Sequence, residues 1–416
     1  MRPSLGNVLF FSAIGCVTIG IIIVTLFAFS PRGKKFLERR LDDRSSFLNS
    51  EGDTAQEMND ATSAPLVETE NGDLAPEHPP TVLQKYTVVN ADDRFAVCND
   101  GSPATYYFAP GTEENNDKWV VYLKGGGSCI NEADCLDRAA NNDPGLVSSN
   151  NYPNGLKEDG ILSADPAINP DFYNWNRVHV RYCSSDLWIG DTENMVGEEL
   201  WQFRGKNIVA AVIEDLQNAE IIKTKTLAEA SELLFVGSSA GGAGVTQNLD
   251  DVARMLPNVQ VRGVADSSAQ VSYEAYDEAY VENLRNADPS FQNRQFDESC
   301  TASLEDGVVN NCVLLNVSYQ HIATPIYYYI DQFDRNRLSN QVSFPLNQNE
   351  RAWVQGYAET LLNFLPNLDG YFVPNKTWHT ALTNERFTIE TIDGVSFQEA
   401  LHNWYFGEGT YNYIAE

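Results

Sequence analysis

The chain has 416 residues and is strongly acidic, with 58 Asp and Glu residues against 28 Lys and Arg residues and a formal net charge of −30. This charge excludes nucleic acid as a partner, because the phosphate backbone would be repelled. A polyanionic glycan would be repelled in the same way at low ionic strength, but salt screens that repulsion.

The N-terminal residues 1–40 are predicted to be a membrane anchor with a basic flank. Residues 8–29 are apolar and carry no charge, which makes a transmembrane helix long enough to span a bilayer. Residues 41–80 are polar and acidic with too few apolar side chains to fold, so they are predicted to be a disordered stalk. Residues 81–416 remain for one large folded domain.

A buried strand is predicted over residues 119–123, and it runs directly into Lys124-Gly125-Gly126-Gly127-Ser128. Bare glycine N–H groups in such a loop can stabilise a developing oxyanion. A flexible turn and a phosphate cradle are the alternatives, although the GxxxxGK[ST] pattern that binds phosphate is missing.

A second buried strand, residues 233–236, leads into Gly237-Ser238-Ser239-Ala240-Gly241-Gly242 and a helix-like stretch. In the pattern Gly-x-Ser-x-Gly, the flanking glycines permit a tight strand-to-helix turn that exposes the serine hydroxyl. This spacing selects Ser239 as the nucleophile, and Ala240 would donate its N–H to the oxyanion. Taken alone, the pentapeptide is also compatible with a glycine-rich turn.

Enzymes with this turn place an acid and then a histidine after the serine in chain order. The predicted strand 325–330 is followed by Asp331 and Asp334, and either acid suits that position. Only two of the five histidines, His379 and His402, come later. His379 lies in a polar loop and His402 in a helix-like segment, and the loop is favoured because catalytic bases are carried by loops on a rigid scaffold.

The alternation of strand-like and helix-like segments from Trp119 onward predicts a mostly parallel sheet with helices on both faces. Combined with the serine turn, this pattern indicates an α/β-hydrolase-like domain. The extra length between Ser268 and Pro325 is expected to form a lid or a side insertion.

Residues from about 86 to 408 resemble the pectin acetylesterase and Notum carboxylesterase family of serine esterases. The motifs that carry the resemblance occur in the family's order: Cys98-Asn99-Asp100-Gly101-Ser102-Pro103-Ala104, Gly125-Gly126-Gly127-Ser128-Cys129, Tyr182-Cys183-Ser184-Ser185-Asp186, Gly237-Ser238-Ser239-Ala240-Gly241-Gly242, Val264-Ala265-Asp266-Ser267 and Phe333-Asp334.

The resemblance implies a catalytic triad of Ser239, Asp334 and His379. The backbone groups that it places in the oxyanion hole are those of Gly126, Gly127 and Ala240. It also implies that Asp266 is structural and lies close beneath the site, and that the loop 184–186 braces the wall of the site.

Six of the seven cysteines lie in the folded region, and two closely spaced pairs are expected to form disulfides, Cys129 with Cys135 and Cys300 with Cys312. The remaining pair, Cys98 with Cys183, is supported by the family resemblance. A zinc site is the alternative, but the sequence has no CxxC pair or HxH cluster, so neither a metal nor a cofactor is expected.

The signals for membrane orientation conflict. Lys and Arg residues are more frequent on the C-terminal flank of the apolar segment, which would leave the domain in the cytoplasm. The expected disulfides, the family and two glycosylation sequons, at Asn316 and Asn375, indicate a lumenal or extracellular domain instead. We therefore expect a single-pass membrane protein of the secretory pathway or cell surface, with release by cleavage as an option.

The resemblance further implies hydrolysis of an acyl ester on a glycan or a protein. Lys124 stands where family members often carry an acid, Gly127 replaces an aromatic residue of Notum-like members, and residues 268–270 depart from their Gly-Trp continuation. These positions fall near the expected acyl pocket and favour a short group, most simply acetyl on a polysaccharide such as pectin. The alternatives are Notum-like deacylation of a lipid-modified protein and a catalytically silent glycan-binding member of the fold.

Overall fold

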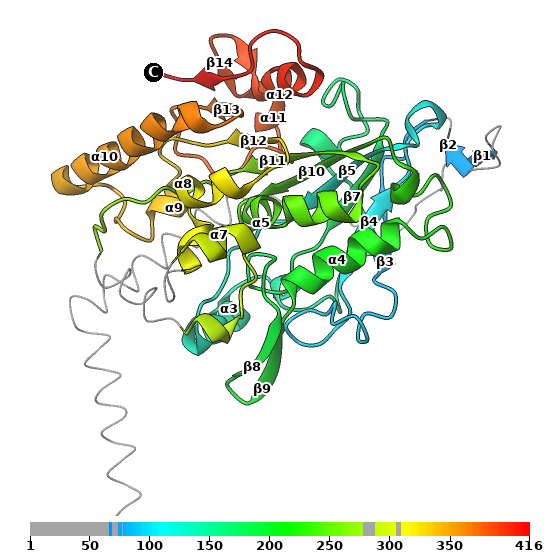
Figure 1. Ribbon diagram of the computed structural model, residues 1–416, viewed down its shortest axis with the longest axis horizontal. Coiled ribbons are helices and arrows are strands. Elements are labelled where there is room, and N and C mark those ends of the chain that lie inside the picture. The colour runs from blue at the N-terminus through cyan, green and yellow to red at the C-terminus, as the bar shows by residue number, and fades with distance from the viewer. Residues whose placement is uncertain (1–65, 69–73, 77, 278–287, 305–308) are drawn as a thin grey trace, which may run out of the picture. The chain divides into compact units, whose positions relative to one another are not determined.

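A computed structural model describes residues 66–68, 74–76, 78–277, 288–304 and 309–416 (Figure 1). The predicted transmembrane segment 8–29 and most of the predicted stalk 41–80 lie outside these residues. Among the helices of the described residues, none has the length and apolar character needed to cross a membrane.

The described domain is organised around one ten-stranded sheet. From one edge to the other its strands are β16 (Tyr413–Ile414), β13 (Gly370–Val373), β12 (Ile326–Tyr329), β11 (Gln260–Asp266), β10 (Glu232–Ser238), β5 (Lys118–Leu123), β7 (Asn176–Val180), β4 (Thr105–Ala109), β3 (Leu83–Thr87) and β6 (Gly155–Leu156). Neighbouring strands are parallel from β16 to β7, as the sequence predicts. The last three strands pair antiparallel, which the sequence pattern did not reveal.

Side chains alternate between the two faces of the sheet, as the pleat of a strand requires. In β5, Trp119, Val121 and Leu123 join the core beneath α4 (Gly205–Leu216), α5 (Ala240–Met255) and α10 (Gln348–Phe364). Val120 and Tyr122 point to the other face and pack with α12 (Phe397–Phe406). Helices thus cover both faces, and Figure 1 shows α12 and α5 on opposite sides of the strands.

Shorter helices complete the described domain. These are α3 (Glu132–Asn141), α7 (Glu298–Ser303), α8 (Leu315–Ser318), α9 (Arg335–Leu338) and α11 (Arg386–Ile389). A hairpin of β8 (Thr192–Val196) and β9 (Glu199–Phe203) packs beside α3.

The carboxyl ends of the parallel strands all meet at one edge of the sheet. The loop after β5 contains Gly126, the turn after β10 contains Ser239, and β11 ends at Asp266. The loops after β12 and β13 contain Asp334 and His379. Open α/β sheets bind ligands at this edge, so the topology brings together residues as distant in sequence as Gly126 and His379.

The described residues contain the three disulfides expected from the sequence, Cys98–Cys183, Cys129–Cys135 and Cys300–Cys312. Cys98 and Cys183 are 85 positions apart, whereas Cys300 and Cys312 are 12 apart. A cross-link that closes a longer loop removes more conformational entropy from the unfolded chain. Losing the first disulfide should therefore destabilise the fold more than losing the third.

The double substitution Cys98→Ser with Cys183→Ser is expected to lower the free energy of unfolding by about 2–5 kcal/mol. The matched control, Cys300→Ser with Cys312→Ser, should lower it by about 1–2 kcal/mol less, because its loop is shorter. Urea unfolding of both variants beside the wild type gives the two losses directly. Equal losses would contradict an entropic origin of the difference.

Candidate active site

Ser239 occupies a strained turn between β10 and α5. Its backbone has φ 55° and ψ −122°, an uncommon combination for a residue with a side chain. A Cβ at Gly237 would collide with the carbonyl of Gly241, and a Cβ at Gly241 would collide with the carbonyl of Leu123. The two glycines of the motif are thus required by close backbone approach, and the turn leaves Ser239 partly accessible to solvent.

The glycine loop after β5 lies directly against this turn. A Cβ at Gly125 would stand 2.9 Å from the Cβ of Ser239 and 2.7 Å from the carbonyl oxygen of Ser238. Gly126 and Gly127 follow with φ values of 144° and 66°, which residues with side chains rarely adopt. Gly125 therefore contacts the serine turn, and the predicted oxyanion-hole residues Gly126 and Gly127 follow it directly in the chain.

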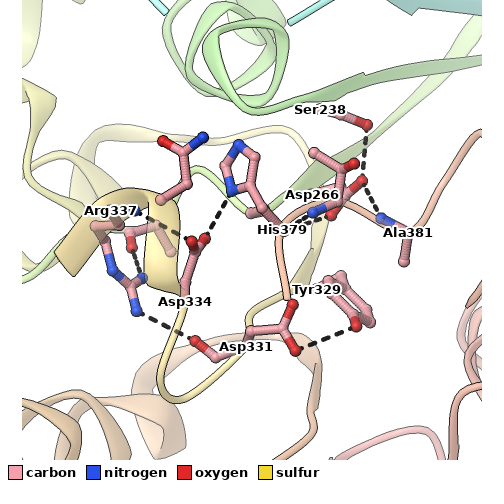
Figure 2. Close-up of polar contacts among 12 residues, drawn as sticks. Ser238, Asp266, Tyr329, Asp331, Asp334, Arg337, His379 and Ala381 are labelled. Carbon is pink, nitrogen blue, oxygen red and sulfur yellow. Dashed lines mark hydrogen bonds and ion pairs between the residues drawn. The ribbon is translucent and has the colours of Figure 1, made fainter. Parts of the chain in front are cut away.

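Asp334 and His379 are hydrogen-bonded partners. Nδ1 of His379 lies 2.8 Å from Oδ2 of Asp334, and the other carboxylate oxygen accepts a bond from the backbone N–H of Arg337 at 3.1 Å. Burial favours a higher pKa for Asp334, but His379 and Arg337 outweigh it and hold the pKa below its ordinary value. In Figure 2 the second ring nitrogen of His379 points away from Asp334.

Asp331 is the other acid whose place in the sequence suits the acid of the triad. Among the hydrogen bonds of the described residues, none joins Asp331 to His379. Asp331 is fully buried, and its nearest described side-chain partner is the hydroxyl of Tyr329 at 3.4 Å (Figure 2). Burial, reinforced by the charge of Asp334, raises the pKa of Asp331 to about 8. At neutral pH the two acids therefore differ in charge, with Asp334 ionised and Asp331 mostly neutral.

Asp331→Asn is expected to flatten the pH dependence of stability between about pH 4 and pH 8. The raised pKa of Asp331 means that its contribution to stability is complete below the unfolded value of 3.8 and is lost as pH rises through about 8. The wild-type melting temperature should thus fall between about pH 4 and pH 8, and the amide should reduce that slope. Thermal melts across this range test the expectation, and an unchanged slope in the variant would refute it.

Asp266 connects the serine turn to the histidine loop. Its Oδ2 accepts bonds from the hydroxyl of Ser238 at 2.7 Å and from the backbone N–H groups of Ala381 and Leu382 at 2.9 and 3.0 Å. Its backbone carbonyl accepts the N–H of Ser239 at 2.8 Å. Burial raises the pKa of Asp266, while these bonds oppose the shift. Asp266 is thus a buried residue that holds the serine turn and the histidine loop together.

The loop 184–186 has a similar bracing arrangement. The buried carboxylate of Asp186 accepts bonds from the Ser184 hydroxyl at 2.7 Å and from the N–H of Gly205, at the start of α4, at 2.7 Å. Burial raises the pKa of Asp186 to about 6. Trp188, two residues on, donates its indole N–H to the carbonyl of Lys124 at 3.1 Å. This loop therefore fixes the beginning of the glycine loop.

Several residues in the loops around the candidate site have strained backbone conformations. Several described non-glycine residues with positive φ lie in its loops: Ser185, Leu187, Trp188, Ser239, Ser267 and Thr380. Such conformations cost of order 1–3 kcal/mol each and tend to cluster at functional sites. The strain supports the assignment of this edge of the sheet as the site.

The other histidines have different partners. His402, on α12, has Nδ1 2.7 Å from Asp171 and Nε2 3.5 Å from Glu408. His179 is buried in β7, with Nδ1 2.8 Å from Glu158. Both rings thus pair with acids other than Asp331 and Asp334.

Two further predictions concern modification and metals. Asn316 and Asn375 are both exposed, which suits glycan acceptors, although glycosylation itself stays a prediction. Among the described residues, no group of three or more His, Cys, Asp or Glu side chains could hold a metal ion.

The segment expected to be a lid or side insertion braces the same region. Gln292 donates from Nε2 to the carbonyl of Cys129 at 2.6 Å and to that of Ser185 at 2.8 Å. Arg138, which sequence reasoning did not single out, contacts Gly126 and Ser185 from α3. No local motif marks either residue, because both act across long sequence separations.

Comparisons with known proteins agree with the motifs. A family model described as Pectinacetylesterase matches residues 78–415. The chain is 30% identical over 324 residues to the palmitoleoyl-protein carboxylesterase NOTUM of Mus musculus, covering 74% of this chain and 62% of that protein. It is 28% identical over 416 residues to palmitoleoyl-protein carboxylesterase notum1' of Xenopus laevis, covering 94% and 83%. The chain thus spans less than two thirds of the mouse relative.

Proposed function

Because the chain belongs to the pectinacetylesterase family, as its motifs predicted, we propose that it is a serine carboxylesterase that removes O-linked acyl groups. The observation that carries this proposal is the 2.8 Å bond between His379 and Asp334, together with Asp266, which connects the histidine loop to the strained turn at Ser239. A pure binding protein has no need of a histidine oriented by an acid together with a partly accessible serine in a strained turn.

The proposed reaction is acyl transfer in two steps. His379 removes the proton from the Ser239 hydroxyl as its oxygen attacks the ester carbonyl, and the alcohol leaves with that proton. Asp334 holds the tautomer of His379 and stabilises the imidazolium. The N–H groups of the glycine loop and of Ala240 stabilise the oxyanion. Water then attacks the acyl-enzyme by the same route and releases the acid.

We assign a short acyl group, most simply acetyl on a polysaccharide such as pectin. Gly127 offers no aromatic side chain to line an acyl pocket, and a Cβ there would meet only the guanidinium of Arg138 at 3.8 Å. The alternative is deacylation of a lipid-modified protein, which the names of the curated relatives favour. A catalytically silent glycan binder is the alternative outside enzymes.

An extracellular or lumenal location is proposed on the disulfides. The described domain has three, and disulfides persist in oxidising compartments. The exposed sequons at Asn316 and Asn375 fit the same location. Attachment to the membrane through residues 8–29 is part of this proposal.

The preferred length of the acyl group distinguishes the proposed substrate classes. With p-nitrophenyl esters, the full-length chain is expected to cleave acetate and butyrate at least about tenfold faster than octanoate, because extra methylenes must fit the acyl site. It should also release acetate from acetylated pectin. A preference for octanoate would favour lipid removal, and no hydrolysis of any ester by folded protein would favour the silent binder.

A further inference from the structure

Resting on the proposed esterase function, we infer that Arg138 is a positioning residue that fixes the oxyanion hole. Its guanidinium Nη1 donates to the carbonyl oxygen of Gly126 at 2.7 Å. The inference concerns the peptide unit that joins Gly126 to Gly127, whose N–H is one of the proposed oxyanion donors.

The geometry of a peptide bond connects Arg138 to that donor. The carbonyl of Gly126 and the N–H of Gly127 belong to one planar trans unit, in which C=O and N–H point in opposite directions. Holding the carbonyl toward α3 therefore directs the N–H away from α3. Gly125, two residues before this N–H, lies against Ser239. In the proposal, the N–H of Gly127 therefore faces the serine turn.

The hydrogen bond from Arg138 restrains a peptide unit that would otherwise be free to rotate. The φ values of 144° and 66° at Gly126 and Gly127 lie in regions that glycine enters at little cost, so the intervening peptide has few steric restraints of its own. A rotated peptide would present a carbonyl oxygen to the oxyanion and would repel it. The bond from Trp188 to the carbonyl of Lys124 restrains the start of the loop, and Arg138 restrains its middle.

Arg138 is itself held in place. Its side chain is buried, and Nε donates to the hydroxyl of Ser185 at 2.7 Å, which in turn donates to Oδ1 of Asn99 at 2.6 Å. Hydrogen bonds from a charged donor are roughly twice as strong as neutral ones. The Cys129–Cys135 disulfide joins α3 to the end of the glycine loop, so donor and acceptor stay in register.

The test compares Arg138→Met and Arg138→Lys in the full-length chain with a matched control, Arg177→Met. Arg177 is another buried arginine that donates to backbone carbonyls, those of Leu162 and Pro80, outside the proposed site. For each protein, kcat and KM for p-nitrophenyl acetate are measured per folded molecule, with the folded fraction from circular dichroism. Affinity for a trifluoromethyl ketone, whose hemiketal oxyanion occupies the hole, is the second readout.

Arg138→Met is expected to lower kcat by about 10²–10³-fold with KM changed less than about threefold, as for loss of one oxyanion donor. Affinity for the ketone should fall by a similar factor, and Arg138→Lys should restore part of both. Arg177→Met should lower the melting temperature without this joint loss. If the wild type is active and Arg138→Met keeps its kcat, the inference about Arg138 is wrong, while the proposed esterase function stands. An equal loss of kcat and ketone affinity in Arg177→Met would lead to the same conclusion. An inactive wild type would instead overturn the proposed function.

Discussion

Ser239→Ala is expected to lower kcat for p-nitrophenyl acetate by about 10⁶-fold while leaving the fold intact. The side chain is partly exposed at the tip of its turn, so losing the hydroxyl removes the nucleophile without opening a cavity in the core. KM should change little, because the hydroxyl forms its bond to substrate only during the reaction. Steady-state hydrolysis beside thermal melts measures both effects.

The neighbouring serine supplies a matched control. Ser238 is buried and donates its hydroxyl to Asp266, which still accepts the N–H groups of Ala381 and Leu382 when that bond is lost. Ser238→Ala should therefore cost about 1–3 kcal/mol of stability and less than about tenfold in kcat. If Ser238→Ala abolished turnover and Ser239→Ala kept it, the register of the motif would be wrong.

His379→Ala is expected to reduce kcat about as far as Ser239→Ala, since nucleophile and base act as a unit. The bond to Asp334 orients its ring, and no other described histidine pairs with an acid on these loops. Hydrolysis by His379→Ala is measured over pH 6–9. The loss of kcat should persist across this range, because hydroxide supplied at higher pH cannot replace a positioned base.

His402→Ala is the control for this prediction. His402 pairs with Asp171 and lies on α12, so its loss should change stability more than activity, with kcat within about threefold of wild type. If His402→Ala abolished turnover and His379→Ala kept it, His402 rather than His379 would be the catalytic base.

The parts of the site that a sequence can indicate are the local ones. The turn at Ser239 was predictable because glycines at fixed offsets report a close backbone approach, and the structure shows that approach at Gly237 and Gly241. His379 could be favoured over His402 because loop and helix positions are visible in the local pattern. Position alone left Asp331 and Asp334 equivalent, since the choice depends on which carboxylate a distant loop approaches.

Features that depend on contacts between residues far apart in sequence were harder to predict from the sequence. The antiparallel pairing of β4, β3 and β6 depends on partners that hydrophobic patterns do not specify. Arg138 resembles any surface arginine in sequence, and its burial and its bond to Gly126 follow only from how α3 docks. Residues that position a site across the fold therefore need the structure.

The most direct test of the central claim is covalent labelling of the full-length chain with a fluorophosphonate, followed by peptide mapping by mass spectrometry. A phosphonate reacts with a serine that an adjacent base activates, so we expect one adduct, on Ser239, and none on Ser238. The adduct should form in step with loss of esterase activity and should be absent from His379→Ala. Folded protein that hydrolyses esters while Ser239 stays unlabelled, or that carries the adduct elsewhere, would contradict the account.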